Sequence, residues 1–434
     1  MTKGKVHITT LGCSKNGYDS DILGGLLEKQ GLILTDQPEE SDIVLINTCG
    51  FIAPAKEESV NAILEAGELK KEGKIKKLLV VGCLSARYKE ELMKEIPEVD
   101  AFFGTEDYKN ILNHLHLQIS NKSDYYENRH VEPGQHVSYI KIGEGCNHTC
   151  AYCAIPLMRG RYRSRYKEDI VREAEILADR GTKELILISQ DTTFYGLDLY
   201  KKQELIPLLE QLEKIEGIEW IRLHYFYPTT IPKGLVDFMK NSDKVLPYVD
   251  IPLQHISDRM LNIMKRGGNK QKIMSLLNEF REKLPEVAIR TTFIVGHPGE
   301  EEEDFQELLS FIKSFKFDRL GVFKYSPEED TSAFEMGDII PEDVKEERYN
   351  AIMSAQQDIS LSKNEALLGK VISVIIDEYN KNDHFLIGRT YMDSPEIDNE
   401  VIIEDVSDDI RIGEIVNVSI TDFDAYELYG RIVT

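Results

Sequence analysis

Three cysteines, Cys146, Cys150 and Cys153, lie within the short segment CNHTCAYC. Three residues separate the first pair and two separate the second. The loop can therefore wrap around an iron-sulfur cluster and ligate three of its irons, because thiolates are the ligands that such clusters take. No other cysteine lies close in the sequence. One iron is then left open, which is typical of a catalytic rather than a structural metal site.

Two other interpretations of this loop remain open. A zinc ion could be held with His148 as a fourth ligand, although ordinary zinc sites use CxxC or HxxxH pairs and His148 would have to bind from within the loop itself. The thiols could also be buried and unligated. The spacing favours the cluster.

The three remaining cysteines each follow an apolar segment. Residues 6–11, 42–47 and 78–81 have the composition of buried parallel strands, and a helical stretch follows each. Open parallel sheets place their ligand sites at the carboxyl ends of the strands, so the thiols should converge there and hold a second cluster. The alternative is that each is a small buried residue at a strand end. These cysteines are Cys13, Cys49 and Cys83.

Composition restricts the class of protein. A chain of 434 residues is long enough for two or three domains. It contains no run of 18 apolar residues and begins like a strand rather than a signal peptide, so we expect a cytoplasmic protein without a membrane partner. Its net charge of −24 argues against broad electrostatic binding of nucleic acid and suits a cationic partner.

The rest of the chain predicts two further β-containing regions. Strand-like and helical segments alternate in the central part, which predicts a parallel sheet, and six such units are too few for an eight-stranded barrel. A polar stretch at 118–136 reads as a linker, and 341–368 reads as a helix. The tail should form a small five-stranded barrel. The predicted strands are 137–142, 184–189, 220–226, 245–253, 288–295 and 319–325, and in the tail 371–376, 385–391, 400–403, 415–420 and 427–433.

The spacing CxxxCxxC, with an aromatic residue before the last cysteine, resembles the radical S-adenosylmethionine (SAM) superfamily, and the three N-terminal cysteines narrow this resemblance to its methylthiotransferases. The resemblance implies an α/β chain with a methylthiotransferase domain at 1–130, an open (β/α)6 radical SAM barrel at 131–365 and a TRAM domain at 366–434. It also implies two 4Fe-4S clusters, SAM, and an electron donor such as flavodoxin or ferredoxin. The family's Asn and Asp-Ser pair correspond to Asn16, Asp19 and Ser20. We expect Asp19 or Ser20 to cap the helix that begins there.

Polar residues at the ends of the barrel strands are candidates for binding SAM, whose ammonium, carboxylate, ribose and adenine each require a partner. Three alternatives stay open: His255 could be a structural residue, the segment 296–299 could be a tight turn before a helix, and Arg290 could form an ion pair within the protein. Basic residues that follow the cysteine loop (159, 161, 163, 165 and 167) should pair with acids or anions near the site. The candidates for SAM are Tyr152, Ser189, Gln190, Asp191, Gln254, His255, Arg290 and Gly296.

Three segments, at 189–196, 250–255 and 393–398, resemble the branch of the family that modifies an aspartate of the small-subunit ribosomal protein twelve, rather than the branch that modifies a tRNA adenosine. The tail from Ala366 onward has 15 acidic residues against five Lys and Arg, so RNA phosphates would be repelled and a basic protein attracted. Exposed acids such as Asp408, Asp409 and Glu414 should steer that encounter. A non-enzymatic iron-sulfur scaffold or electron carrier is the alternative from another class.

Overall fold

The computed structural model describes residues 4–118, 123–337, 339–404 and 410–433. The chain divides into two compact units. The first unit comprises residues 1–133, 139–148 and 153–176, and the second comprises residues 134–138, 149–152 and 177–434. Among the described helices, none is both long enough and apolar enough to cross a membrane. The predicted domain boundaries after 130 and 365 stay predictions.

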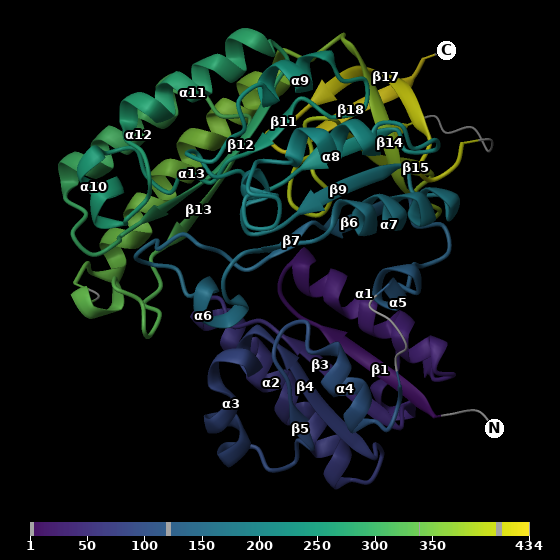
Figure 1. Ribbon diagram of the computed structural model, residues 1–434. Helices are drawn as coiled ribbons and strands as arrows, with labels where there is room; N and C mark the ends of the chain where they lie inside the picture. Colours follow the sequence, from purple (N-terminus) through teal and green to yellow (C-terminus); the bar gives the residue numbers. More distant parts are fainter. Residues whose placement is uncertain (1–3, 119–122, 338, 405–409, 434) are drawn as a thin grey trace. The chain divides into compact units, whose positions relative to one another are not determined.

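Five parallel strands form the main sheet of the first unit, in the order β2-β1-β3-β4-β5 (Figure 1). The three predicted strands are confirmed as β1, β3 and β4, and Val44 and Val80 of this sheet pack against Ile63 and Leu92 of two helices. Thr48 lies opposite Gly82, so the cysteine-bearing ends of β3 and β4 are level. The elements are β1 (Lys5–Thr10), α1 (Ser14–Lys29), β2 (Ile33–Leu34), η1 (Pro38–Glu40), β3 (Ile43–Thr48), α2 (Ala53–Lys71), β4 (Lys77–Gly82), α3 (Cys83–Glu95), β5 (Ala101–Phe102) and α4 (Tyr108–His114).

The predicted capping role of Asp19 and Ser20 is wrong. Helix α1 begins at Ser14, with Cys13 at its N-cap position, so both residues lie inside the helix and are buried. The helix starts early because Gly12, with φ of +93°, turns the chain sharply after β1. Asp19 instead accepts a hydrogen bond from the Tyr108 hydroxyl at 2.7 Å.

The predicted linker at 118–136 includes residues 119–122, which lie outside the described residues, but its remainder contains regular structure that the sequence did not predict. It contains the short helix α5 (Ser123–Glu127). Arg129 is buried and forms ion pairs with Asp21 at 2.6 Å and Glu173 at 3.2 Å. The remaining elements of the first unit lie near the cysteine loop: β7 (Gly143–Glu144), α6 (Ile155–Arg159), β8 (Arg163–Ser164) and α7 (Lys167–Asp179).

Two three-stranded sheets, β10-β9-β6 and β11-β12-β13, follow in chain order. A parallel bridge between Ile221 and Val245 joins them, which confirms six strands in an open partial barrel. The elements are β6 (Val137–Lys141), β9 (Glu184–Ile188), η2 (Thr192–Phe194), α8 (Leu205–Leu212), β10 (Trp220–Leu223), α9 (Leu235–Asn241), β11 (Tyr248–Asp250), α10 (Asp258–Ile263), α11 (Lys270–Lys283), β12 (Ala288–Val295), α12 (Glu302–Phe315), β13 (Arg319–Lys324) and η3 (Phe334–Met336).

The tail forms a closed barrel in the strand order β14-β15-β16-β18-β17, drawn in yellow-green to yellow in Figure 1. Val374, Leu386, Val401 and Val418 are among the side chains that fill its core. The predicted helix and all five predicted strands are therefore confirmed. They are α13 (Glu342–Glu365), β14 (Val371–Asn380), β15 (Phe385–Thr390), β16 (Glu400–Glu404), β17 (Ile415–Phe423) and β18 (Glu427–Ile432).

Candidate functional site

The carboxyl ends of β1, β3 and β4 bring Cys13, Cys49 and Cys83 together. A Cβ atom on Gly12 would lie 2.9 Å from the Cys49 sulfur, so a larger residue would not fit beside this thiol. Burial raises the pKa of Cys83 to about 12; Arg159 opposes this shift, and the charges of Cys13 and Cys49 add to it. Thr48 of β3 lies opposite Gly82 of β4, so Cys49 and Cys83 leave neighbouring strands at the same level. A bound iron-sulfur cluster would supply positive charge to such neighbouring thiolates.

The described residues contain one compact set of side chains that could hold a single metal ion, and it is made of acids. Among the described residues, only Asp19, Glu106 and Glu144 bring three ligand atoms of His, Cys, Asp or Glu within 4.8 Å of one another. The ammonium of Lys141 already joins this acidic set, at 2.9 Å from Glu106 and 2.7 Å from Glu144, and it also contacts Asp19.

Hydrogen bonds of the backbone hold residues 146–148, the part of the cysteine loop that belongs to the first unit. The Cys146 N–H donates to the Gly160 carbonyl at 3.0 Å, and Asn147 Oδ1 accepts the Tyr162 N–H at 3.1 Å. The backbone N–H of His148 donates to the Cys146 sulfur at 3.4 Å. Such a donor stabilises a thiolate. His148 therefore has a contact with the site through its backbone, without any need to act as a metal ligand.

In the second unit, Cys150 is buried against an arginine that sequence reasoning missed. Arg266 Nη1 lies 3.5 Å from the Cys150 sulfur, and its guanidinium stacks over the ring of Tyr227 at 4.0 Å. The Ala151 N–H donates to the Met264 carbonyl at 2.8 Å, which holds the loop beside this arginine. Because Arg266 is far along the chain from the cysteine loop and belongs to no recognised motif, no sequence signal could have found it.

Three polar residues, 189–191, follow β9. Ser189 and Asp191 stabilise the turn there, and Gln190 has polar groups without a partner among the described residues. The Asp191 carboxylate accepts hydrogen bonds from the Phe194 N–H at 3.1 Å and the Thr230 hydroxyl at 2.9 Å, so it shapes the turn. Ser189 supports the same turn by accepting the Asp191 N–H at 3.1 Å. Both amide atoms of Gln190 are buried and have no hydrogen-bond partner within the described chain. Gln190 therefore fits a bound polar ligand.

His255 and His297 each keep one ring nitrogen available. His255 Nδ1 accepts the Ser257 N–H at 3.0 Å, which places the ring proton on Nε2. Burial lowers the pKa of His255 to about 3, so this ring is neutral. Its Nε2 and that of His297 are buried and lack a partner among the described residues. The neighbouring Gln254 has φ of +72°, a strained conformation that is common at functional sites.

The segment that begins at Gly296 forms a tight turn, which is the alternative that the sequence left open for it. Gly296 has φ of +73°, and the N–H groups of Gly296 and His297 both donate to the Glu300 carboxylate. Tyr152 meets the edge of the His297 ring with a centroid separation of 6.3 Å. Tyr152 and the unused nitrogen of His297 therefore lie in the same region of the second unit.

Arg290 lies in the ion pair that the sequence left as an alternative. It is the third residue of β12, and it pairs with Asp250 and Asp398, each at 3.2 Å. The pairing predicted for the basic residues after the cysteine loop is confirmed for Arg159, which lies 2.9 Å from Glu144. It is confirmed in the same way for 163 and 165.

Comparison with known families covers most of this architecture. Residues 140–312 match the radical SAM superfamily, residues 5–104 match the uncharacterized protein family UPF0004, and residues 368–433 match the TRAM domain. Two solved structures share the fold. The radical SAM methyltransferase TsrM from Kitasatospora setae, with cobalamin and a [4Fe-4S] cluster bound, has a TM-score of 0.55 at 14% identity and covers 77% of this chain and 78% of its own. The cobalamin-dependent SAM radical enzyme OxsB has a TM-score of 0.52 at 12% identity, with 80% and 56% covered.

Full-length relatives are more specific. A protein of Aquifex aeolicus (strain VF5) named ribosomal protein uS12 methylthiotransferase RimO is 50% identical over 98% of this chain and 97% of its own length. The protein of that name from Christiangramia forsetii is 49% identical over 99% and 95%, and that from Clostridioides difficile (strain 630) is 44% identical over 99% of each chain. At this identity over nearly the whole length of each chain, the chain belongs to the RimO family of radical SAM methylthiotransferases.

Proposed function

We propose that this protein transfers a methylthio group to the β carbon of an aspartate in ribosomal protein uS12. The observation that carries the proposal is the identity of 44% to 50% with proteins named uS12 methylthiotransferase over nearly their whole length. The acidic tail supports a basic protein substrate rather than RNA, because the sequence from Ala366 onward contains 15 acidic residues and only five Lys and Arg. With a ribosomal substrate, the proposed place of action is the cytoplasm.

Radical SAM enzymes carry a 4Fe-4S cluster and use SAM. In this chain Cys146, Cys150 and Cys153 are the proposed ligands of that cluster. We place a second 4Fe-4S cluster on the N-terminal cysteines, which their positions directly after neighbouring parallel strands and the close approach of Gly12 to the Cys49 side chain support. When bound, these groups would supply the sulfur, the methyl group and the radical that removes a hydrogen from the substrate. An external electron donor such as flavodoxin or ferredoxin would supply the electrons. The proposed ligands of the second cluster are Cys13, Cys49 and Cys83.

The residues of the barrel would bind SAM and orient it. The unused amide of Gln190 and the Nε2–H of His255 are the proposed partners of its polar groups, and Tyr152 offers a ring face to the adenine. Ser189, Asp191, Gln254 and Gly296 shape the loops that carry these groups. Arg290 has no proposed part in binding SAM, because its guanidinium is committed to two aspartates.

Two triple variants test the assignment of the clusters. Replacing Cys146, Cys150 and Cys153 with Ala should leave one cluster and abolish the cleavage of SAM to methionine and deoxyadenosine. Replacing Cys13, Cys49 and Cys83 with Ala should also leave one cluster but retain SAM cleavage without methylthio transfer. Iron content equal to two clusters in either variant would refute the assignment. Absence of SAM cleavage by the reduced, fully loaded protein would favour the non-enzymatic scaffold.

His148→Ala provides the control for the zinc interpretation. The cluster assignment predicts that this variant retains its iron content and its visible absorption, because the contact from the His148 backbone N–H to the Cys146 sulfur does not need the imidazole ring. Loss of bound metal on this single change would instead support zinc.

A further inference from the structure

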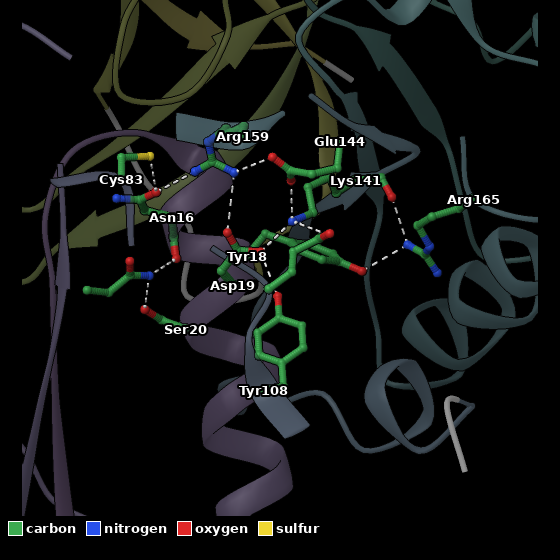
Figure 2. Close-up of polar contacts among 12 residues, drawn as sticks. Asn16, Tyr18, Asp19, Ser20, Cys83, Tyr108, Lys141, Glu144, Arg159 and Arg165 are labelled. Atoms are coloured by element: carbon green, nitrogen blue, oxygen red, sulfur yellow. Dashed lines mark hydrogen bonds and ion pairs between the residues drawn. The ribbon is translucent and has the colours of Figure 1, made fainter. Parts of the chain in front are cut away.

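A buried arginine in the first unit contacts the surroundings of both cysteine-bearing segments (Figure 2). Arg159 Nη2 donates to Asn16 Oδ1 at 2.6 Å, and Nη1 lies 2.9 Å from Glu144 Oε1. Asn16 is three residues after Cys13, and Glu144 is two residues before Cys146. One guanidinium therefore joins a residue beside the N-terminal cysteine site to a residue beside the cysteine loop.

The helix that ends at Arg159 makes a second link. Helix α6 begins two residues after Cys153. Its residue Met158, together with Ala154, packs in one buried cluster with Cys83. The backbone that leaves the cysteine loop is thus packed directly on a proposed ligand of the second cluster.

Arg159 has three side-chain partners, because Asp19 Oδ2 also lies 3.5 Å from its Nη1. The two closest partners, Asn16 and Glu144, are held rigidly. The Asn16 side-chain amide donates to the carbonyls of Leu11 at 2.7 Å and Thr48 at 3.0 Å, which directs its Oδ1 toward the arginine. Glu144 is held on its other oxygen by Lys141 at 2.7 Å. Because two fixed acceptors lie in different directions, the planar fork of an arginine meets both, whereas a lysine ammonium could not reproduce this geometry.

Arg159 also brings a positive charge close to the N-terminal thiols. Its Nη2 and the Cys83 sulfur both contact Asn16 Oδ1, so the guanidinium and the sulfur lie next to the same side-chain oxygen. Figure 2 shows Asn16 between the Cys83 side chain and the guanidinium, and the Cys83 sulfur lies 3.9 Å from Asn16 Oδ1. Only 5% of Arg159 is exposed, so solvent screens this charge weakly.

We propose that Arg159 is a positioning residue with two separable roles: its fork fixes the N-terminal cysteine site and the cysteine loop relative to each other, and its charge stabilises the reduced state of the cluster bound by Cys13, Cys49 and Cys83. The inference rests on the proposed function, since it requires that second cluster. Reduction adds negative charge to a cluster, so a nearby fixed positive charge raises its reduction potential.

The charge role is tested by redox titration of the Cys146→Ala, Cys150→Ala, Cys153→Ala protein, monitored by EPR. In this background Arg159→Gln should lower the midpoint potential and Arg159→Lys should leave it close to that of the parent. Glu144→Gln removes a neighbouring negative charge and should raise the potential. Arg163→Gln is the matched control, because Arg163 is exposed and pairs only weakly with Glu106 at 3.3 Å. Its potential should not change.

The fork role is tested in the protein with all six cysteines. Arg159→Lys should keep the iron content of both clusters and the rate of SAM cleavage, but should form several-fold more deoxyadenosine per methylthio product, because the segment before Cys146 is no longer fixed relative to Asn16 and the N-terminal cysteines. Iron content and thermal unfolding of each variant report on folding.

Three results would overturn the inference. Potentials of Arg159→Gln and Glu144→Gln that both equal the parent's would exclude the charge role. Unchanged coupling of SAM cleavage to product in Arg159→Lys would exclude the fork role. A parent triple variant without any cluster would contradict the two-cluster proposal itself, and the role of Arg159 with it, which distinguishes the two failures.

Discussion

The guanidinium of Arg266 lies 3.5 Å from the sulfur of Cys150. A second contact, from Nη2 to the Pro252 carbonyl, ties the same group to the segment that follows β11. The arginine is buried, and it is therefore a fixed positive charge beside one proposed ligand of the radical SAM cluster. Partners of metal ligands orient those ligands and adjust their basicity.

We expect Arg266→Gln to reduce the rate of SAM cleavage by about tenfold or more, since loss of such partners typically costs 10- to 100-fold in activity or affinity. The measurement is deoxyadenosine formation by protein with matched iron content. Lys265→Gln, at the adjacent exposed position, is the control and should retain the parent rate. A full rate in Arg266→Gln would show that the contact with Cys150 has no role in the chemistry.

Arg389→Ala should strongly destabilise the second unit. Arg389 lies 2.9 Å from Glu184 and 2.6 Å from Asp377, and Glu184 is completely buried. Without Arg389, the buried Glu184 keeps Arg222 at 2.6 Å as its remaining cationic partner. We therefore expect a cost at or below the about 3 to 5 kcal/mol in the free energy of unfolding that a buried charge left without any partner incurs. Urea titration would measure it. Arg431→Ala, which removes an exposed pair at 3.9 Å, should cost about 0 to 1 kcal/mol. Equal costs for the two changes would contradict this account.

Glu300 should give the stability a component that decreases as pH rises. Burial raises the pKa of Glu300 from 4.5 to about 7, and the Arg348 charge opposes part of this shift. Between these values the folded state holds a proton that the unfolded state has lost, so the free energy of unfolding falls with rising pH, by on the order of 3 kcal/mol in total. Glu300→Gln should remove this component from urea titrations between pH 4.5 and 7, whereas the exposed Glu303→Gln should keep it. An unchanged pH dependence in Glu300→Gln would refute the assignment.

The acidic tail should act mainly on the rate of encounter with uS12. Asp408 and Asp409 lie outside the described residues, but Glu378, Glu404 and Glu414 are exposed. Changing these three to Lys should slow capture of uS12 at low salt and matter little at high salt, because the Debye length falls from about 10 Å at 0.1 M to about 3 Å at 1 M. A tRNA substrate would respond in the opposite sense, since lysines would bind its phosphates. Faster capture of uS12 by the lysine variant would contradict the proposed steering.

The local parts of the fold could be predicted from the sequence. Apolar runs identified β1, β3 and β4 within one residue at most ends, and the position of a cysteine at each end followed from them. The start of α1 could not be predicted from its capping residues, because the left-handed conformation of Gly12 decides it. Arg129 gave the polar stretch before the barrel its order through tertiary ion pairs, which composition does not reveal.

The contacts around the cysteines depend on residues remote in sequence. The cysteines themselves carry a spacing that can be recognised, but Arg266 approaches Cys150 from 116 residues away. Similarly, Arg159 meets Asn16 across 143 residues. A single sequence shows that an arginine is present, and only the fold shows which thiol it neighbours. Gln190 and Asp191 were equal candidates by their place at a strand end, and only the fold shows that the Gln190 amide is buried without a partner among the described residues while the Asp191 carboxylate is occupied.

Mass spectrometry of purified uS12 tests the proposed function most directly. The ribosomal protein would be incubated without air with the cluster-loaded enzyme, SAM and a reductant, in parallel with tRNA. We predict that one aspartate of uS12 gains a methylthio group in place of a hydrogen, and that neither cysteine triple variant produces this change. Unmodified uS12, together with a methylthio group on a tRNA adenosine, would contradict the account.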